Sequence, residues 1–279
     1  NYWGSDNPDF SVLIDKSRAP NGSVDYFPYY SDVALSTLIY KMVTISEDTV
    51  WATPHPNQKV TILDGATLTL SAPMSLDTVT MREGAQVKSN LADQTGSVTT
   101  KSLRFSPNLS GTGWKAFGMP FTSAVINNST EEEILAPSQQ SADNGIWFAR
   151  LKDNKTPEFV VDETAFGMAG LWAANGDTYT ISSEGAFEFK TLEDPAAPTE
   201  TGTFLMCSNP NTFTITLKQS AYILTADGTS FEQEANPEIK PFQSFVLTDT
   251  KTLSTLRSLR IGDGVVTGTE GIGPVGGFY

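Results

Sequence analysis

The sequence predicts an all-β protein, in which the end of a parallel β-helix or short β-solenoid is followed by an antiparallel β-sandwich-like domain. The apolar runs are short and rarely follow the 3.6-residue period of a helix. Asp-Gly, Glu-Gly and Asn-Gly pairs mark tight turns between the runs, because glycine tolerates the positive φ that such turns need. One nine-residue segment also recurs 19 residues further on.

The repeat lies in residues 1–110, which we expect to form a closing coil and a short solenoid. Val60–Leu68 recurs as Val79–Val87, and a third copy is expected at 98–106. A strand–turn–strand unit with a period near 20 residues is typical of stacked β-coils, since each coil buries its inner face against the next. Two unrelated hairpins with similar turns are the alternative. The side chains expected to form the inward ladder are Val60, Ile62, Leu68, Val79, Met81 and Val87.

One helix is expected before the repeat, over residues 31–38, with Ser31 or Asp32 as its N-cap. After the repeat, residues 111–261 are richer in long and aromatic strands, which suit a sandwich of two sheets. Residues 262–279 are glycine-rich and are expected to be a linker to a further C-terminal module. The strands expected in the sandwich-like domain are 114–117, 145–150, 178–181, 186–189, 212–217, 221–224 and 242–247.

Charge and residue counts exclude several classes of function. A net charge of −14 argues against binding to a nucleic-acid backbone, which requires clustered Lys and Arg, and against docking on anionic membranes. No apolar run is long enough to span a bilayer, so no membrane insertion is expected. Cys207 is the only cysteine and His55 the only histidine, which leaves no intrachain disulfide and no Cys-rich or His-rich metal site.

Several segments resemble parts of secreted and cell-surface proteins of Bacteroidetes. Asn1–Gly4, followed by the aromatic segment Val24–Tyr30, is similar to the coil that closes their right-handed parallel β-helix regions. The resemblance implies an extracellular location, exposed at the outer membrane, and it carries no catalytic residue. The segments similar to their sandwich-like domain of unknown function and to the linker after it are 114–121, 147–148, 237–242 and 267–272.

Four residues are candidates for contact or modification. Trp51 and Trp172 lie beside Pro- or Gly-containing loops, where an indole ring can stack on a sugar; packing in the core is the alternative. Thr49 and Thr78 each stand in an Asp-Thr-Val triplet similar to Bacteroidetes O-glycosylation sites. His55, between two prolines, is expected to be a surface-loop residue.

The sequence predicts no catalytic residue, cofactor or metal ligand. Cys207 is expected to be a buried and inert thiol. Asp6, Asn7 and Asp9 are more typical of a capping turn than of a calcium loop. We expect a non-catalytic segment that serves as a spacer or adhesion module, with host or dietary glycans or surface proteins as partners. A carbohydrate-binding module and a carboxylate-based glycosidase or lyase are the alternatives. The acidic residues considered for catalysis are Glu131, Glu132, Glu133, Glu163, Glu188 and Glu232.

Overall fold

A computed structural model describes most of the chain from residue 42 to residue 261 and two short strands before it. Strand makes up 47% of the structure, and the described part holds one short helix, so the prediction of a mostly β protein is confirmed. No helix in this part is long and apolar enough to cross a membrane. The described residues are 29–30, 38–39, 42–91, 95–107, 113–118, 124–130, 133–134, 148–156, 158–161, 169–173 and 178–261.

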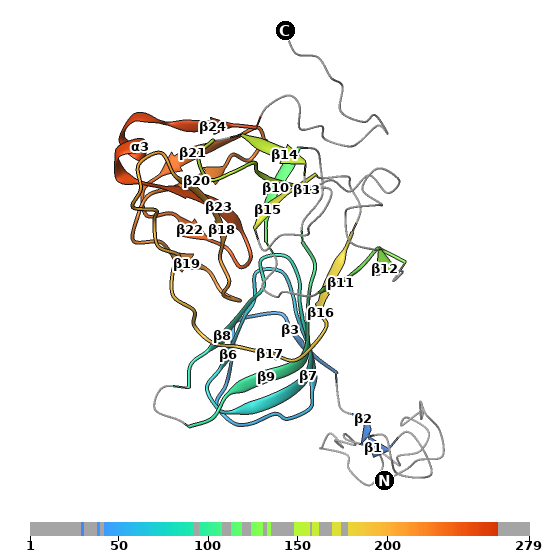
Figure 1. Cartoon of the computed structure of the whole chain (residues 1–279). Helices are drawn as coiled ribbons and strands as arrows, with labels where there is room; N and C mark the ends of the chain where they lie inside the picture. The colour runs from blue at the N-terminus through green and yellow to red at the C-terminus, as the bar shows by residue number, and fades with distance from the viewer. Residues whose placement is uncertain are drawn as a thin grey trace.

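The repeat folds into two parallel sheets that face each other at one end of the molecule (Figure 1). Each unit gives one strand to each sheet and turns between them. The strands of the first sheet are β3 (Met42–Ile45), β5 (Lys59–Ile62), β7 (Met74–Met81) and β9 (Val98–Phe105). Those of the second are β4 (Thr49–Trp51), β6 (Thr67–Leu70) and β8 (Gln86–Ser89).

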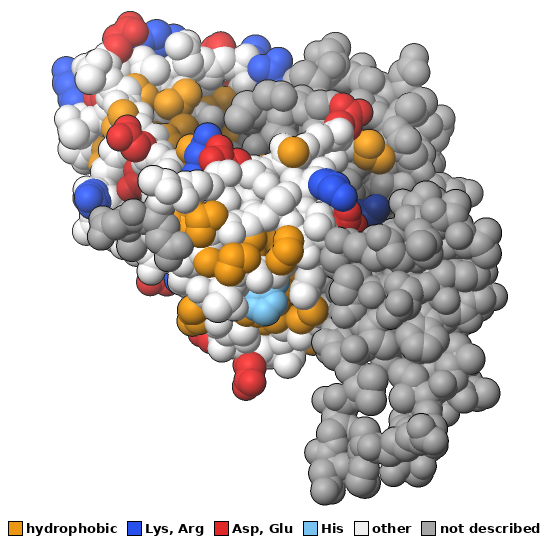
Figure 2. Space-filling model, turned by 90° about the horizontal axis from the view of Figure 1, so that it is seen from below, with side chains coloured by type: hydrophobic (Ala, Val, Ile, Leu, Met, Phe, Trp, Pro, Cys, Tyr) orange, Lys and Arg blue, Asp and Glu red, His pale blue; other side chains and the backbone are white. Residues whose placement is uncertain are grey.

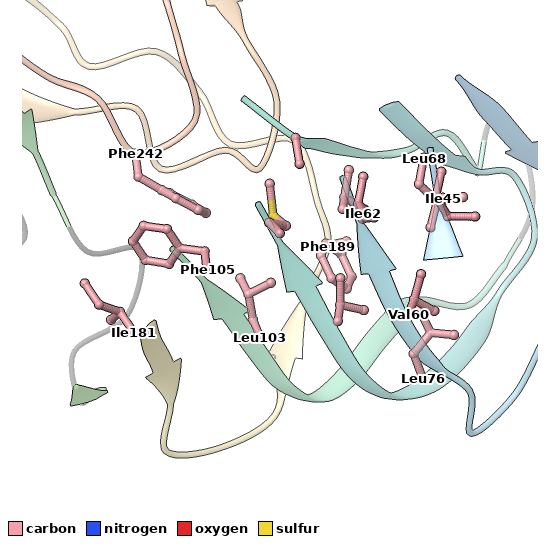
Figure 3. Close-up of a cluster of buried hydrophobic side chains, with 14 of the residues drawn as sticks. Ile45, Val60, Ile62, Leu68, Leu76, Leu103, Phe105, Ile181, Phe189 and Phe242 are labelled. Atoms are coloured by element: carbon pink, nitrogen blue, oxygen red, sulfur yellow. The ribbon is translucent and has the colours of Figure 1, made fainter. Parts of the chain in front are cut away.

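The first two copies stack in the predicted register. Val60 lies opposite Val79, and Leu68 lies opposite Val87, in parallel pairs with an offset of 19 residues. All six side chains of the predicted inward ladder are at most 2% exposed, and Figure 3 shows part of this core. The turns also stack: Gly65 and Gly84 have φ values of 77° and 70°, in the left-handed region that favours glycine.

The predicted register of the third copy is wrong. Val79 pairs with Leu103 rather than with Val98, and Val98 pairs with Met74 instead. The cause is the length of one connection. Three residues, 71–73, join β6 to β7, whereas eight residues, 90–97, join β8 to β9. The five additional residues shift the third unit while its alternation of inward and outward side chains is kept.

The repeat does not form a free-standing solenoid. The outer edge of β9 pairs antiparallel with β16 (Thr180–Ser183) and with β17 (Phe187–Glu188). Beyond β16 lie β11 (Ala124–Asn127) and β12 (Glu133–Ile134), which completes a mixed eight-stranded sheet. Strands from both sides of the predicted boundary at residue 110 therefore share one sheet.

Three antiparallel sheets make up the other end of the molecule. The four-stranded sheet contains β10 (Trp114–Phe117), β13 (Phe148–Leu151), β14 (Phe159–Val161) and β15 (Gly170–Ala173). The five-stranded sheet contains β18 (Phe204–Ser208), β20 (Ala221–Leu224), β21 (Ser230–Glu234), β23 (Ser244–Thr248) and β24 (Ser258–Arg260). The two-stranded sheet pairs β19 (Ile215–Thr216) with β22 (Glu238–Ile239).

The four-stranded sheet is buried on both faces. On one face, Leu171 of β15 belongs to a core shared with the five-stranded sheet, in which Phe159 and Phe231 stack with ring centroids 5.2 Å apart. On the other face, Trp172 belongs to the core of the repeat. Since successive side chains of a strand point to opposite faces, β15 connects the two cores. The five-stranded sheet packs its second face against β19 and β22.

Two sequence predictions for local structure need correction. Residues 31–37 of the predicted helix lie outside the described part, but Leu38 belongs to a strand, β2 (Leu38–Ile39), which pairs with β1 (Tyr29–Tyr30). The helix that the structure does show, α3 (Thr250–Thr255), was missed. It is only six residues long and rich in threonine, a poor helix former, although Asp249 before it is a recognisable N-cap.

The hydrogen bonds to the Asp249 carboxylate predict that the protein loses stability in acid. This buried carboxylate accepts hydrogen bonds from the Thr252 hydroxyl and from the backbone N–H groups of Gly202, Lys251 and Thr252. These donors, the Thr252 hydroxyl above all, hold the pKa of Asp249 well below its usual range. A lowered folded-state pKa stabilises the fold above the unfolded-state pKa, so this contribution is lost as the pH falls below about 4.

Denaturant unfolding of the wild type and Asp249→Asn at several pH values measures this contribution. The advantage of the wild type is expected to be constant near neutral pH and to shrink below about pH 4, the ordinary pKa of aspartate. Thr252→Val, which removes the hydroxyl donor, should raise the folded-state pKa of Asp249, so the loss should become smaller and be complete at a higher pH. A difference between wild type and Asp249→Asn that stays flat into strong acid would contradict the role of the charge.

Candidate functional site

The two tryptophans predicted to stack on sugars lie in the core. Trp172 has no exposed surface, and the rings of Phe117 and Phe148 meet it edge-on at centroid distances of 5.5 and 6.2 Å. Trp51 is 8% exposed and packs against His55, with ring centroids 4.4 Å apart. Neither indole offers an open face, so the structure corrects the prediction of a stacking platform and supports the alternative of core packing.

His55 lies on a face where hydrophobic side chains surround it (Figure 2). It is half-buried against Trp51 rather than fully in solvent. Met42 on β3 and Val50 on β4 are 67% and 64% exposed. Both strands are the outermost of their sheets among the described strands, so this face is the outer edge of the first coil.

The two threonines of the Asp-Thr-Val triplets lie on opposite faces of their strands: Thr49 shares the inward face of β4 with Trp51 and pairs with buried Leu68, whereas Thr78 lies on the outward face of β7. Thr49 begins β4, is half-buried, and donates its hydroxyl to the carbonyl oxygen of Glu47 at 2.9 Å. Thr78 is half-buried on β7, between Lys59 on β5 and Ser102 on β9. Their O-glycosylation stays a prediction.

Cys207 and the acidic residues show no assembled chemistry within the described part. Burial raises the pKa of the Cys207 thiol to about 12, which keeps it protonated at neutral pH. Glu188 on β17 and Glu232 on β21 are both exposed and belong to different sheets. No group of three or more His, Cys, Asp or Glu side chains is placed to hold a metal ion among the described residues. The side chains that lie outside the described part are those of Glu131, Glu132, Glu133, Glu163, Asp6, Asn7 and Asp9.

A cavity of about 350 Å³ lies where the repeat meets the antiparallel sheets. Five segments line it: the turn after β7, the end of β9, strand β10, the turn after β20, and the turn before β23. Its walls include the rings of Phe105, Phe117 and Phe242, and three cationic residues stand along it. Phe105 and Phe242 point toward each other in Figure 3, with ring centroids 4.7 Å apart. The cationic residues are Arg82, Lys115 and Lys240.

No family model, curated protein or solved structure matches this chain. The resemblance to secreted Bacteroidetes proteins therefore stays a prediction from the sequence.

The backbone of Phe242 is held in an unusual conformation at the cavity wall. Its φ of 61° lies in the left-handed region, which is rare for a large side chain. Two hydrogen bonds fix it: the N–H of Phe242 donates to Asn209 at 3.1 Å, and its carbonyl oxygen accepts from Gly118 at 2.7 Å. Backbone strain of this kind gathers at binding and catalytic sites, where the surroundings over-determine it.

Asn209 holds the turn that carries Lys240 and Phe242. Its side chain is fully buried, and its amide NH₂ group donates to the carbonyl oxygens of Phe213, Ile239 and Lys240 at 2.8–3.1 Å. Sequence reasoning missed this asparagine and the three cationic residues. The cations come from segments far apart in the chain with no regular spacing, so only the folded structure brings them together.

Proposed function

We propose that this chain is a non-catalytic segment of a secreted or cell-surface protein, acting as a structural spacer or adhesion module. The observation that carries the proposal is the continuous core between the repeat and the antiparallel sheets. Phe242, from the turn before β23, and Trp172, from β15, belong to the same hydrophobic cluster as Val60 and Leu68 of the repeat. A spacer holds its ends at a fixed separation, which requires its parts to be packed together.

Hydrogen bonds reinforce this junction at the edge of β8. The N–H of Val87 donates to the carbonyl oxygen of Thr212 at 2.8 Å, and the Thr212 hydroxyl donates back to the carbonyl oxygen of Val87 at 2.7 Å. The N–H of Thr214 donates to the side-chain oxygen of Gln86 at 2.9 Å. Residues 212–214, predicted as part of a strand paired within the sandwich, instead close the open edge of the repeat.

We infer that the coils from β3 to β9 are the end of a parallel β-helix or short solenoid, and that the two facing antiparallel sheets are a sandwich-like domain. Parallel in-register pairing of the first two copies supports the first part, and the shared core of the two sheets supports the second. The resemblance supports an extracellular, outer-membrane-exposed location, with glycans or surface proteins as partners and a further C-terminal module.

The unfolding transition tests whether the chain is one rigid unit. We expect tryptophan fluorescence and far-UV circular dichroism to report one coincident transition in denaturant, and calorimetric and van't Hoff enthalpies to agree. Thr212→Val, which removes one junction hydrogen bond, should move the whole transition to lower denaturant. The exposed change Thr216→Val on β19 is its control. Two separate transitions, of which Thr212→Val shifts only one, would overturn the proposal because a hinge would then lie between the parts.

A further inference from the structure

The cavity between the repeat and the antiparallel sheets has a charge opposite to that of the protein. The chain carries a net charge of −14, yet three cationic residues and a single acid, Glu83, line this cavity. Within the described part, Arg82, Lys115 and Lys240 form no ion pair, whereas four other lysines pair with carboxylates. Cations that lack partners in an acidic protein favour an anionic ligand.

Two side chains that line the cavity, those of Ser106 and Gln243, carry hydrogen-bond donors with no partner among the described residues. The hydroxyl of Ser106 is buried and has no hydrogen-bond partner among the described residues, which is costly unless a ligand or a water fills the place. The side-chain oxygen of Gln243 accepts from the N–H of Lys240 at 3.0 Å. This bond orients the Gln243 amide and leaves its NH₂ group as a donor.

The size and walls of the cavity define the body of the ligand. A volume of about 350 Å³ is at the lower end of small-molecule sites, which suits one ring rather than a polymer segment. The rings of Phe105, Phe117 and Phe242 supply apolar surface on the side of the repeat core. A ligand that uses the whole cavity therefore has an anionic group, hydrogen-bond acceptors and one apolar face.

We propose that this cavity binds a carboxylated sugar ring, either free or at the end of a glycan chain. Its carboxylate pairs with the cations from three separate segments, and its hydroxyl oxygens accept from Ser106 and Gln243. Its apolar ring face lies against the phenylalanine wall. This role goes beyond that of a spacer, and it places ligand recognition away from Trp51 and Trp172.

Calorimetric titration of the full chain tests the proposal with three probes: D-glucuronate, a glucuronate-terminated oligosaccharide and D-glucose. Glucuronate should bind saturably in the millimolar range or tighter, and glucose at least about tenfold more weakly. The affinity should fall with added salt, since the contact is between charges. Binding of the oligosaccharide alone would assign the site to glycan ends. Equal binding of glucose and glucuronate, or no binding of either acidic probe, would overturn the proposal.

Charge-removing variants locate the binding. Lys115→Gln with Lys240→Gln is expected to weaken binding of the acidic probe at least about tenfold, as loss of two charged contacts implies. Lys101→Gln is the matched control, because this lysine pairs with Asp77 on the repeat and does not line the cavity. Circular dichroism melting shows whether each variant folds. Binding that the double variant leaves unchanged, or that Lys101→Gln weakens equally, would contradict a site in this cavity. If the double variant loses binding but still unfolds in a single transition, the proposed spacer role is unaffected.

Discussion

Replacing Trp172 by alanine is expected to destabilise the protein by about 3–5 kcal/mol, the usual cost of emptying a large aromatic site in a core. The indole is fully buried, and the rings of Phe117 and Phe148 meet it edge-on. These neighbours cannot close the space, because they belong to strands paired on either side of β15. The cavity that remains then adds to the lost burial energy.

Urea unfolding at constant pH measures this effect, and two variants serve as controls. Trp172→Phe keeps an aromatic ring and should lower the free energy of unfolding clearly less than Trp172→Ala does. Trp51→Ala, at the edge of the first coil, should also cost less, because its neighbour His55 is only half-buried. A Trp172→Ala protein as stable as the wild type that had lost affinity for a sugar would restore Trp172 as a contact residue.

Trp172 also shows where sequence reasoning reached its limit. In a sheet with one buried and one solvent-facing side, a tryptophan beside a turn signal is a candidate for exposure. In the structure both Leu171 and Trp172 are fully buried, on opposite faces of β15. A strand between two cores has no polar face, and a short sequence segment does not reveal which layers will cover it.

The local features of the repeat were predictable because they depend on neighbouring residues. The alternation around Val60 and Val79, and the glycines at positive φ in the turns, are properties of single units. The register of the third copy could not be predicted in this way. It depends on the length of the 90–97 connection, and the chain accommodates that length without changing which side chains face inward. The cavity could not be predicted either, since Arg82, Lys115 and Lys240 line it only after five segments far apart in the sequence pack together.

The second large effect is expected at Asn209, where Asn209→Asp should destabilise the fold by about 3–5 kcal/mol at neutral pH, the range for an uncompensated buried charge. The amide NH₂ donates to three backbone carbonyl oxygens, and its oxygen accepts from the N–H and the side chain of Asn211 at 2.9 and 3.2 Å. A carboxylate keeps the second set of contacts but turns the first into repulsion between oxygens. Because aspartate and asparagine have nearly the same size, the loss of stability in Asn209→Asp reports the buried charge rather than a change of side-chain shape.

The pH dependence distinguishes this cause from simple loss of hydrogen bonds. Burial and the facing carbonyl oxygens raise the folded-state pKa of the introduced carboxyl group above its unfolded value of about 3.9. Its stability deficit should therefore grow as the pH rises through that raised pKa and shrink toward pH 4, where the protonated acid can donate one hydrogen bond. Asn209→Ala, which leaves the carbonyl oxygens without a donor but adds no charge, should show a deficit that does not depend on pH. If urea unfolding gave both variants the same pH-independent deficit, the carbonyl oxygens would not face the side chain as the structure has them. The turn that carries Lys240 and Phe242 would then need another explanation for its left-handed backbone.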